Sequence, residues 1–199
     1  MVQRNSQLQS LLDHVETSIS NDRDITVPTT RLTNAIFSSL RAQTIEPRKP
    51  NPMRLLPCAM LDDAVAEACK TPYKAADVAM AFKAIEAQLT WTRRKGWENE
   101  DVTFAQGHAN ATIVGPGGLE PRDDVWIGVS LMAPHVRYPD HQHPPEEVYT
   151  VLSEGDWRQG DGDWFTPGIG GVVHNPPGIV HAMRSGDKPL LAIWCLWIG

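Results

Sequence analysis

The chain has 199 residues, a hydrophobic fraction of 41% and a formal net charge of −6. This length and composition exclude a disordered chain and predict a globule with a substantial core. The acidic balance argues against nucleic acid as a partner, and no basic run or long apolar run indicates membrane binding. The three cysteines lack C-x-x-C spacing and no signal peptide is visible, so we expect reduced thiols in a cytoplasmic protein.

Helical patterns dominate the first half of the chain. Four stretches have apolar or alanine-rich spacing typical of helices, namely 6–19, 29–40, 61–70 and 74–94. The proline-rich stretch 46–57 between them predicts a loop. We therefore expect residues 1–95 to form a helical region.

From residue 96 onward the chain consists of short β-type runs separated by glycine, proline and aspartate. The runs are 111–115, 125–133, 146–155, 162–168, 171–178 and 190–199. Short strands at close spacing predict a sandwich or barrel rather than a βαβ array. The expected fold class is mainly β with an α-helical N-terminal region, in which helices over 1–95 pack on a β-barrel over 96–199.

The stretch YPDHQHPPEEVYTVL, residues 138–152, gathers an unusual number of titratable side chains. Alternate residues of a strand share one face. The odd-numbered residues that would share a face here are His141, His143, Glu147 and Tyr149. Two histidines at i and i+2 followed by a carboxylate are typical of half a metal site, and the same alternation turns Glu146 away. A polar loop with incidental histidines is the alternative that this stretch alone leaves open.

A second motif lies at residues 170–181, GGVVHNPPGIVH, and fits the pattern G-x5-P-x-G-x2-H. Its glycines and prolines predict a tight turn before a strand, which would deliver His181 as a third imidazole. His174 precedes that turn, and we interpret it as structural or as a partner of a ligand. His108, outside both motifs, we interpret as solvated or structural.

Together, H-x-H-x3-E and G-x5-P-x-G-x2-H resemble the two motifs of the cupin superfamily, whose fold is a jelly-roll-like double-stranded β-barrel. The resemblance implies that one divalent transition metal ion, such as zinc, iron, manganese or nickel, is bound. The ligands that it implies are His141, His143, Glu147 and His181. The sequence departs from the first motif at His135, where a glycine is expected; this departure concerns turn geometry rather than the ligands.

The extended pattern HQHPPEEVY resembles the bacterial cupin-type dimethylsulfoniopropionate (DMSP) lyases, best over residues 110–199. The resemblance implies a metal-dependent lyase that cleaves a small sulfonium carboxylate, DMSP, into acrylate and dimethyl sulfide by a β-elimination that a tyrosine initiates. We expect Tyr149 to be the base, because a neighbouring cation favours the phenolate. Tyr138, which also matches the family, would assist or hold the substrate.

A sulfonium group carries positive charge without hydrogen-bond donors, so aromatic faces suit it. The candidates for this contact are Trp197 and Trp126, with Tyr138. Two other functions stay open: a cupin dioxygenase or isomerase acting on another small carboxylate, and a non-catalytic cupin that binds a small molecule. Barrels of this kind expose strand edges, which allow a homodimer.

Overall fold

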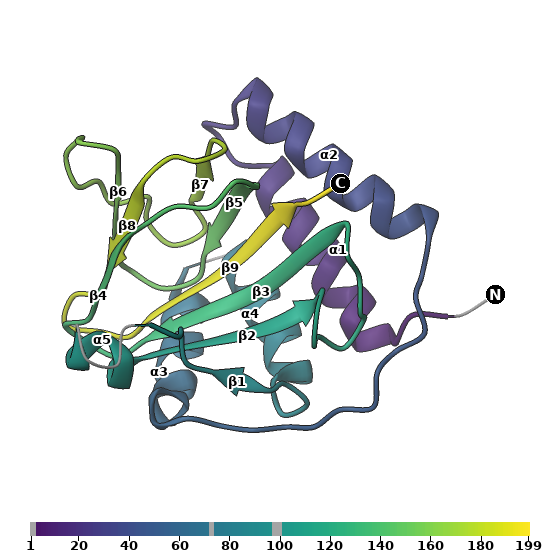
Figure 1. The fold of residues 1–199 in the computed structure, drawn as a ribbon, viewed down its shortest axis with the longest axis horizontal. Helices are drawn as coiled ribbons and strands as arrows, with labels where there is room; N and C mark the ends of the chain where they lie inside the picture. Colours follow the sequence, from purple (N-terminus) through teal and green to yellow (C-terminus); the bar gives the residue numbers. More distant parts are fainter. Residues whose placement is uncertain (1–2, 72–73, 97–100) are drawn as a thin grey trace.

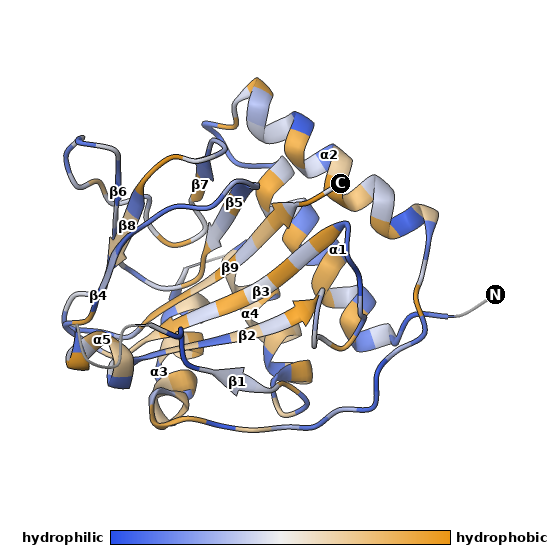
Figure 2. Cartoon of the chain, in the orientation of Figure 1, coloured by the Kyte–Doolittle hydropathy of each residue, from blue (hydrophilic) through white to orange (hydrophobic). Residues whose placement is uncertain are grey.

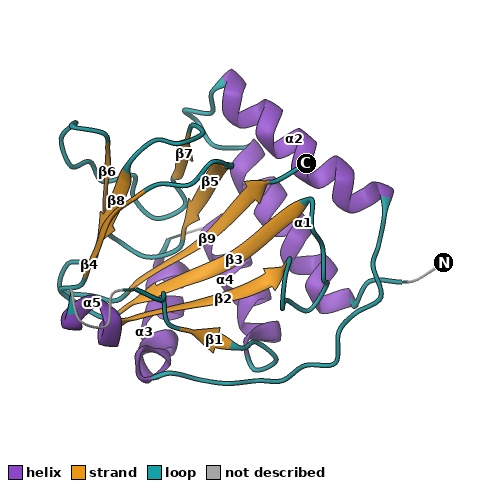
Figure 3. Cartoon of the chain, in the orientation of Figure 1, coloured by secondary structure: helices purple, strands orange, loops and turns teal. Residues whose placement is uncertain are grey.

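The computed structural model describes residues 3–71, 74–96 and 101–199. The helices of the N-terminal region are α1 (Ser6–Ser20), α2 (Val27–Ala42), the 3-10 helix η1 (Leu56–Met60), α3 (Leu61–Lys70) and α4 (Lys74–Glu86). The short helix α5 (Val102–Gly107) precedes the main strands (Figures 1 and 3). Within the described residues, no helix combines the length and the apolar character that crossing a bilayer requires.

The described strands form a six-stranded and a three-stranded antiparallel sheet. In spatial order the larger sheet contains β1 (Trp91–Thr92), β2 (His108–Val114), β3 (Val125–Met132), β9 (Leu190–Trp197), β5 (Glu146–Val151) and β7 (Val172–Asn175). The smaller sheet contains β4 (Arg137–His141), β8 (His181–Arg184) and β6 (Asp156–Gln159).

Helices cover one face of the larger sheet, and the smaller sheet covers the other. One apolar cluster joins α1 to α4 with outward-facing strand residues such as Val148 and Ile193. A second cluster fills the space between the sheets and includes Tyr149 of β5, Trp157 of β6 and Met183 of β8. Apolar residues recur along β3 and β9 and on the helices (Figure 2). The space between the two sheets is the barrel interior.

The structure confirms the expected fold class, mainly β with a helical N-terminal region, and the helices expected at 6–19, 29–40 and 61–70. The larger core cluster is continuous across helices and sheet. Strand β1, from within residues 1–95, pairs with β2, so the N-terminal region also supplies an edge strand. The division of the chain at residue 95 stays a prediction.

Two local expectations are wrong, and one short helix was not expected. The helix expected over 74–94 ends at Glu86, because Trp91 and Thr92 instead pair with β2. The strand expected over 162–168 is a loop with one isolated bridge at Phe165, and the strand that it contacts is β6. Helix α5 was not expected; Asp101 caps it by accepting a hydrogen bond from the Phe104 amide.

Candidate metal and active site

Both sheets contribute side chains to the site. On the smaller sheet, His141 of β4 is paired in register with His181 of β8. On the larger sheet, Glu147 lies near the start of β5, with Tyr149 one strand period further on. His143 lies between β4 and β5, where the chain crosses from one sheet to the other. The barrel thus brings together residues of both motifs, including His141 and His181, which are 40 positions apart in sequence.

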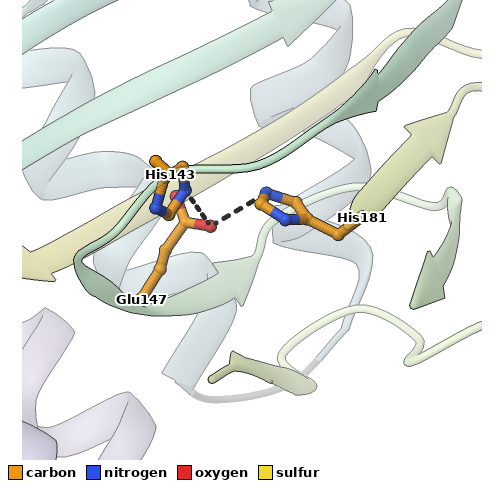
Figure 4. Close-up of side chains that lie close together, drawn as sticks. All are labelled: His143, Glu147 and His181. Carbon is orange, nitrogen blue, oxygen red and sulfur yellow. Dashed lines mark ion pairs between the residues drawn. The ribbon is translucent and has the colours of Figure 1, made fainter. Parts of the chain in front are cut away.

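Three of these side chains form a compact cluster (Figure 4). The candidate ligand atoms of His143, Glu147 and His181 all lie within 4.8 Å of one another. The Nε2 atoms of both histidines are each 3.3 Å from Oε2 of Glu147. His141, the fourth predicted ligand, is not part of this three-residue cluster; its ring centroid lies 4.1 Å from that of His181 and 6.4 Å from that of His143.

The imidazoles are oriented by their other nitrogens. Nδ1 of each histidine lies within hydrogen-bond distance of a backbone carbonyl two residues away; the pairs are His141 with Pro139 (2.9 Å), His143 with Pro145 (2.9 Å) and His181 with Ile179 (3.0 Å). A carbonyl oxygen only accepts, so Nδ1 carries the proton and Nε2 presents its lone pair. A backbone carbonyl in this role is typical of metal-bound histidine.

This orientation tests whether a metal fits. The lone pairs of two Nε2 atoms then face the carboxylate oxygen of Glu147 at 3.3 Å, which is unfavourable unless a cation lies between them. Nε2 of His181 is buried and has no hydrogen-bond partner within the described part of the chain. The donor set of imidazole nitrogens and one carboxylate suits a divalent transition metal. The residues therefore fit a metal ion.

Protonation at the site agrees with this donor set. Burial, reinforced by the neighbouring His181, lowers the pKa of His141 to about 3, so its imidazole is neutral at pH 7. Burial alone would raise the pKa of Glu147, but without a metal the imidazoles of His143 and His181, when protonated at Nε2, outweigh burial through hydrogen bonds and charge and hold that pKa at about 2. A bound metal ion would take the place of those protons. Neutral imidazoles with an ionised carboxylate are the forms that bind metal.

Glu146 and His174 lie on the other face of the larger sheet. Glu146 accepts two hydrogen bonds from Arg31 of α2, at 2.8 and 2.9 Å, and its Oε1 is 2.8 Å from Nε2 of His174. The carboxylate thus points toward the helices, whereas the neighbouring Glu147 points into the barrel. Strand alternation separates the two glutamates.

The two tyrosines line the barrel interior beside the ligands. Tyr149 lies buried in the interior one strand period after Glu147 on β5, and the Tyr138 ring stacks on His141 with centroids 4.1 Å apart. Burial raises the pKa of Tyr138 to about 12, and burial together with the charge of Glu147 raises the pKa of Tyr149 well above its usual value. Both phenols are therefore neutral in the protein alone, and a phenolate requires a nearby cation.

The tryptophans are placed differently from one another. Trp197 packs against the cluster on the helix side of the sheet, and Trp126 is 37% exposed on β3. Trp194, which was not among the expected contacts, lies opposite Tyr149 on β9 and packs against the barrel-interior cluster. The roles of Trp197 and Trp126 as substrate contacts stay predictions. Strand alternation in the sequence places Trp194 on the same face as Leu190 and Ala192. Which face of β9 lines the interior is known only once the neighbouring strands are known.

His108 also lies in the interior, buried rather than solvated. It stacks on Phe104 at 4.6 Å and meets the edge of Tyr138 at 4.7 Å. Burial lowers its pKa to about 3, so the ring is neutral. His108 therefore forms part of the wall that confines Tyr138, a role that its isolated position in the sequence did not indicate.

Comparisons with known proteins agree with this geometry. The model of the dimethylsulfoniopropionate lyase family matches residues 29–192. The chain belongs to that family. The match covers both motifs and most of the helical region. It therefore begins well before residue 110, where the resemblance seen in the sequence begins.

Two curated relatives carry the family's name. The dimethylsulfoniopropionate lyase DddQ of Ruegeria pomeroyi is 29% identical over 157 residues, which cover 78% of this chain and 76% of the relative. The putative dimethylsulfoniopropionate lyase DddL of Cereibacter sphaeroides is 29% identical over 119 residues, covering 60% of this chain. The match spans 50% of the length of DddL.

The fold agrees as well. The crystal structure of DddQ from Ruegeria pomeroyi superposes with a TM-score of 0.72 and 24% identity, covering 98% of this chain and 92% of that one. At this identity the likeness shows the fold of the family, including its helical N-terminal region and its two sheets.

Proposed function

We propose that this protein is a metal-dependent DMSP lyase that cleaves dimethylsulfoniopropionate into acrylate and dimethyl sulfide. The observation that carries the proposal is the position of Tyr149, which lies buried in the barrel interior one strand period from the candidate ligand Glu147, in a member of the DMSP lyase family. A proton acceptor beside a metal ligand is what this elimination requires.

The proposed ligands are His141, His143, Glu147 and His181, and zinc, iron, manganese and nickel all accept this donor set. When bound, the metal would act as a Lewis acid that offsets the negative charge developing on the substrate carboxylate and lowers the pKa of a nearby phenol. The barrel supports this role because it buries Glu147 and His181 and holds each imidazole by a backbone carbonyl.

The elimination itself needs a base at the carbon next to the carboxylate. In our proposal the Tyr149 phenolate takes the α-proton, the electrons of that C–H bond form the Cα=Cβ double bond, and the Cβ–S bond breaks. Dimethyl sulfide leaves with the sulfur electron pair and acrylate remains, so the sulfonium charge is neutralised as the proton is removed. Tyr138, packed between Phe104 and His141, would hold the substrate or assist.

The sulfonium end requires an aromatic rather than a hydrogen-bonding surface. Each favourable cation–π contact contributes about 0.5–2 kcal/mol. Trp194 is suitably placed for such a contact, since it faces the barrel interior from the strand next to Tyr149. We also retain Trp126 and Trp197 as proposed contacts of the sulfonium group and add Trp194 to them.

A headspace assay with purified protein and DMSP tests the reaction. Metal-loaded wild type should release dimethyl sulfide, and Tyr149→Phe should lower kcat by roughly 10²–10⁴-fold while metal content is retained. Tyr138→Phe should cost less, because its hydroxyl is not the base. Wild type that takes up metal but releases no dimethyl sulfide with zinc, iron, manganese or nickel contradicts the proposal.

Matched glutamates provide the control. Glu147→Gln should lose both metal and activity, whereas Glu146→Gln, one residue away and paired with Arg31 on the opposite face, should keep both. Oxygen consumption by iron-loaded protein together with activity that survives Tyr149→Phe would instead indicate a dioxygenase, and ligand binding without turnover would indicate a non-catalytic cupin.

A further inference from the structure

The ligands of the proposed metal centre lie on separate sheets at a seam without backbone pairing. Strand β7 is the last strand of the larger sheet and β6 is the last strand of the smaller one. No ladder joins β6 to β7 in the described part of the chain. The distance from Glu147 to His181 therefore depends on what holds these two edges together.

Side chains connect the edges at the level of the ligands. Asn175 of β7 is paired in register with Glu147, and Gln159 of β6 is paired in register with His181. Nε2 of Gln159 donates to Oδ1 of Asn175 at 2.7 Å, and Nδ2 of Asn175 donates to Oε2 of Glu147 at 2.8 Å. One hydrogen-bonded chain thus runs from the smaller sheet to the carboxylate on the larger sheet.

The direction of this chain is determined by a backbone carbonyl. Gln159 also donates to the carbonyl oxygen of His174 at 2.6 Å, and a carbonyl can only accept. The amide nitrogen of Gln159 must therefore face β7, which leaves Oδ1 of Asn175 as the acceptor and directs its Nδ2 toward the carboxylate. With Asn175 flipped, two donors would face each other and two acceptors would face each other.

The acceptor of the last bond is the oxygen at the centre of the cluster. Oε2 of Glu147 is the same atom that lies 3.3 Å from Nε2 of both His143 and His181. Asn175 is fully buried, so neither water nor a neighbouring side chain on the surface can replace its amide. A displacement of this amide moves the oxygen that faces both imidazoles.

We propose that Gln159 and Asn175 are positioning residues that set the metal affinity of the site without touching the metal. Asn175 holds Oε2 of Glu147 toward the histidines, and Gln159 acts from across the seam between the sheets by fixing the Asn175 amide and by bonding the His174 carbonyl. The inference rests on the proposed metal centre but not on the identity of the substrate.

Metal affinity measured with Zn²⁺ and Co²⁺ against a chromophoric chelator tests this order of action. Asn175→Leu should weaken binding by roughly 10–100-fold and Gln159→Leu by about tenfold, the range typical of groups that orient ligands. The double variant should weaken binding by clearly less than the product of the two single effects, because both variants break the shared route through the Asn175 amide. Gln7→Leu, at an exposed position of α1, is the matched control.

Two readouts separate positioning from a general loss of structure. The visible absorption of bound Co²⁺ should shift in both single variants, since the carboxylate ligand moves, while the control keeps the wild-type spectrum. The half-exposed Gln159 variant should retain its unfolding temperature to within a few degrees. Unchanged affinity and spectrum in Gln159→Leu, or single effects that multiply fully in the double variant, would overturn the inference.

The outcomes also distinguish this inference from the proposed reaction. Wild type that binds metal but releases no dimethyl sulfide contradicts only the reaction, because affinity and spectrum still report on Gln159 and Asn175. Wild type that binds no metal contradicts both.

Discussion

Gly128 of β3 lies directly opposite Trp194 of β9, and a Cβ atom at position 128 would overlap the Trp194 indole. The same Cβ would lie 2.6 Å from the carbonyl oxygen of Ala111 on β2. Gly128 therefore provides the space in which the ring lies flat against the wall of the barrel interior. The absence of a side chain on one strand determines where an aromatic ring stands on the next.

Gly128→Ala should destabilise the fold by roughly 1–3 kcal/mol, because the well-packed neighbours must shift to accept the methyl group. It should also raise the KM for DMSP, since the displaced Trp194 ring enters the interior. Denaturant unfolding and lyase kinetics measure the two effects. Gly186→Ala, at a glycine where an added Cβ would meet no atom within 4 Å, should change neither. An unchanged KM in Gly128→Ala would show that Trp194 does not border the substrate.

Removal of metal should lower the unfolding temperature. An ion that binds only the folded state stabilises it by about 4.1 kcal/mol when its free concentration is about 1,000 times the dissociation constant. A chelator should remove this stabilisation in wild type and in Glu146→Gln, and should have no further effect on Glu147→Gln or His181→Ala. Calorimetry with and without chelator measures the difference. An identical chelator shift in Glu147→Gln and wild type would contradict the assignment of Glu147.

Stability in acid should depend on Asp124. Arg122 donates to both carboxylate oxygens of Asp124, at 2.7 and 2.8 Å, and this pairing lowers the pKa of the carboxyl from 3.8 to about 2. Because the folded-state pKa is depressed, the stabilisation is fully present above pH 4 and is lost as the pH falls toward 2. Asp124→Asn should lower the free energy of unfolding by about 1–2 kcal/mol at pH 7. This value is reduced for solvent screening, because the Asp124 side chain is 29% exposed.

Urea unfolding of wild type and Asp124→Asn between pH 2 and pH 7 measures this contribution. The difference between the two stabilities should shrink steeply as the pH falls toward 2, where the carboxyl is already protonated in the unfolded state and about half protonated in the folded state. Asp161→Asn, at an exposed loop position, should follow wild type throughout. A gap that stays constant down to pH 2 would show that the cost of Asp124→Asn is not electrostatic.

A buried hydroxyl pair should contribute to the attachment of the helices to the barrel. The hydroxyls of Ser18 in α1 and Thr150 in β5 are 3.0 Å apart, and both residues are fully buried. Ser18→Ala should cost about 1–3 kcal/mol, because the Thr150 hydroxyl is left without a partner in the core. Ser18→Ala combined with Thr150→Val should recover part of that loss, since both polar groups are then gone. A double variant as unstable as the sum of the single variants would contradict this coupling.

Local sequence patterns predicted most of the helices and the side of the strand to which each glutamate points. The amphipathic spacing of Leu8, Leu11 and Leu12 is sufficient to indicate α1, because the side chains of one helix face are set by the 3.6-residue repeat alone. Alternation likewise predicts that Glu146 and Glu147 point to opposite faces. His135 occupies the expected glycine position and adopts a left-handed φ of 59°, so the backbone there retains the conformation that the motif requires.

The elements that were missed depend on pairing partners distant in sequence. Residues 91–92 belong to an apolar, helix-like run, and they became a strand because the edge of β2 offers unpaired backbone groups to them. The pairing with β2 stabilises these residues more than their helical propensity does. The extent of α4 therefore could not be read from its own residues.

The sequence by itself determined the family, the fold class and the residue types of a metal site, because these depend on periods and spacings within one segment. Only the tertiary structure decided which residues support that site. Asn175 occupies an unspecified position of the second motif, and Gln159, His108 and Trp194 lie outside both motifs. Asn175 and Gln159 connect to Glu147, and His108 and Trp194 line the interior, because two sheets close on each other. Contact across a barrel depends on register and on which strands become neighbours, and neither is encoded in the spacing of a single strand.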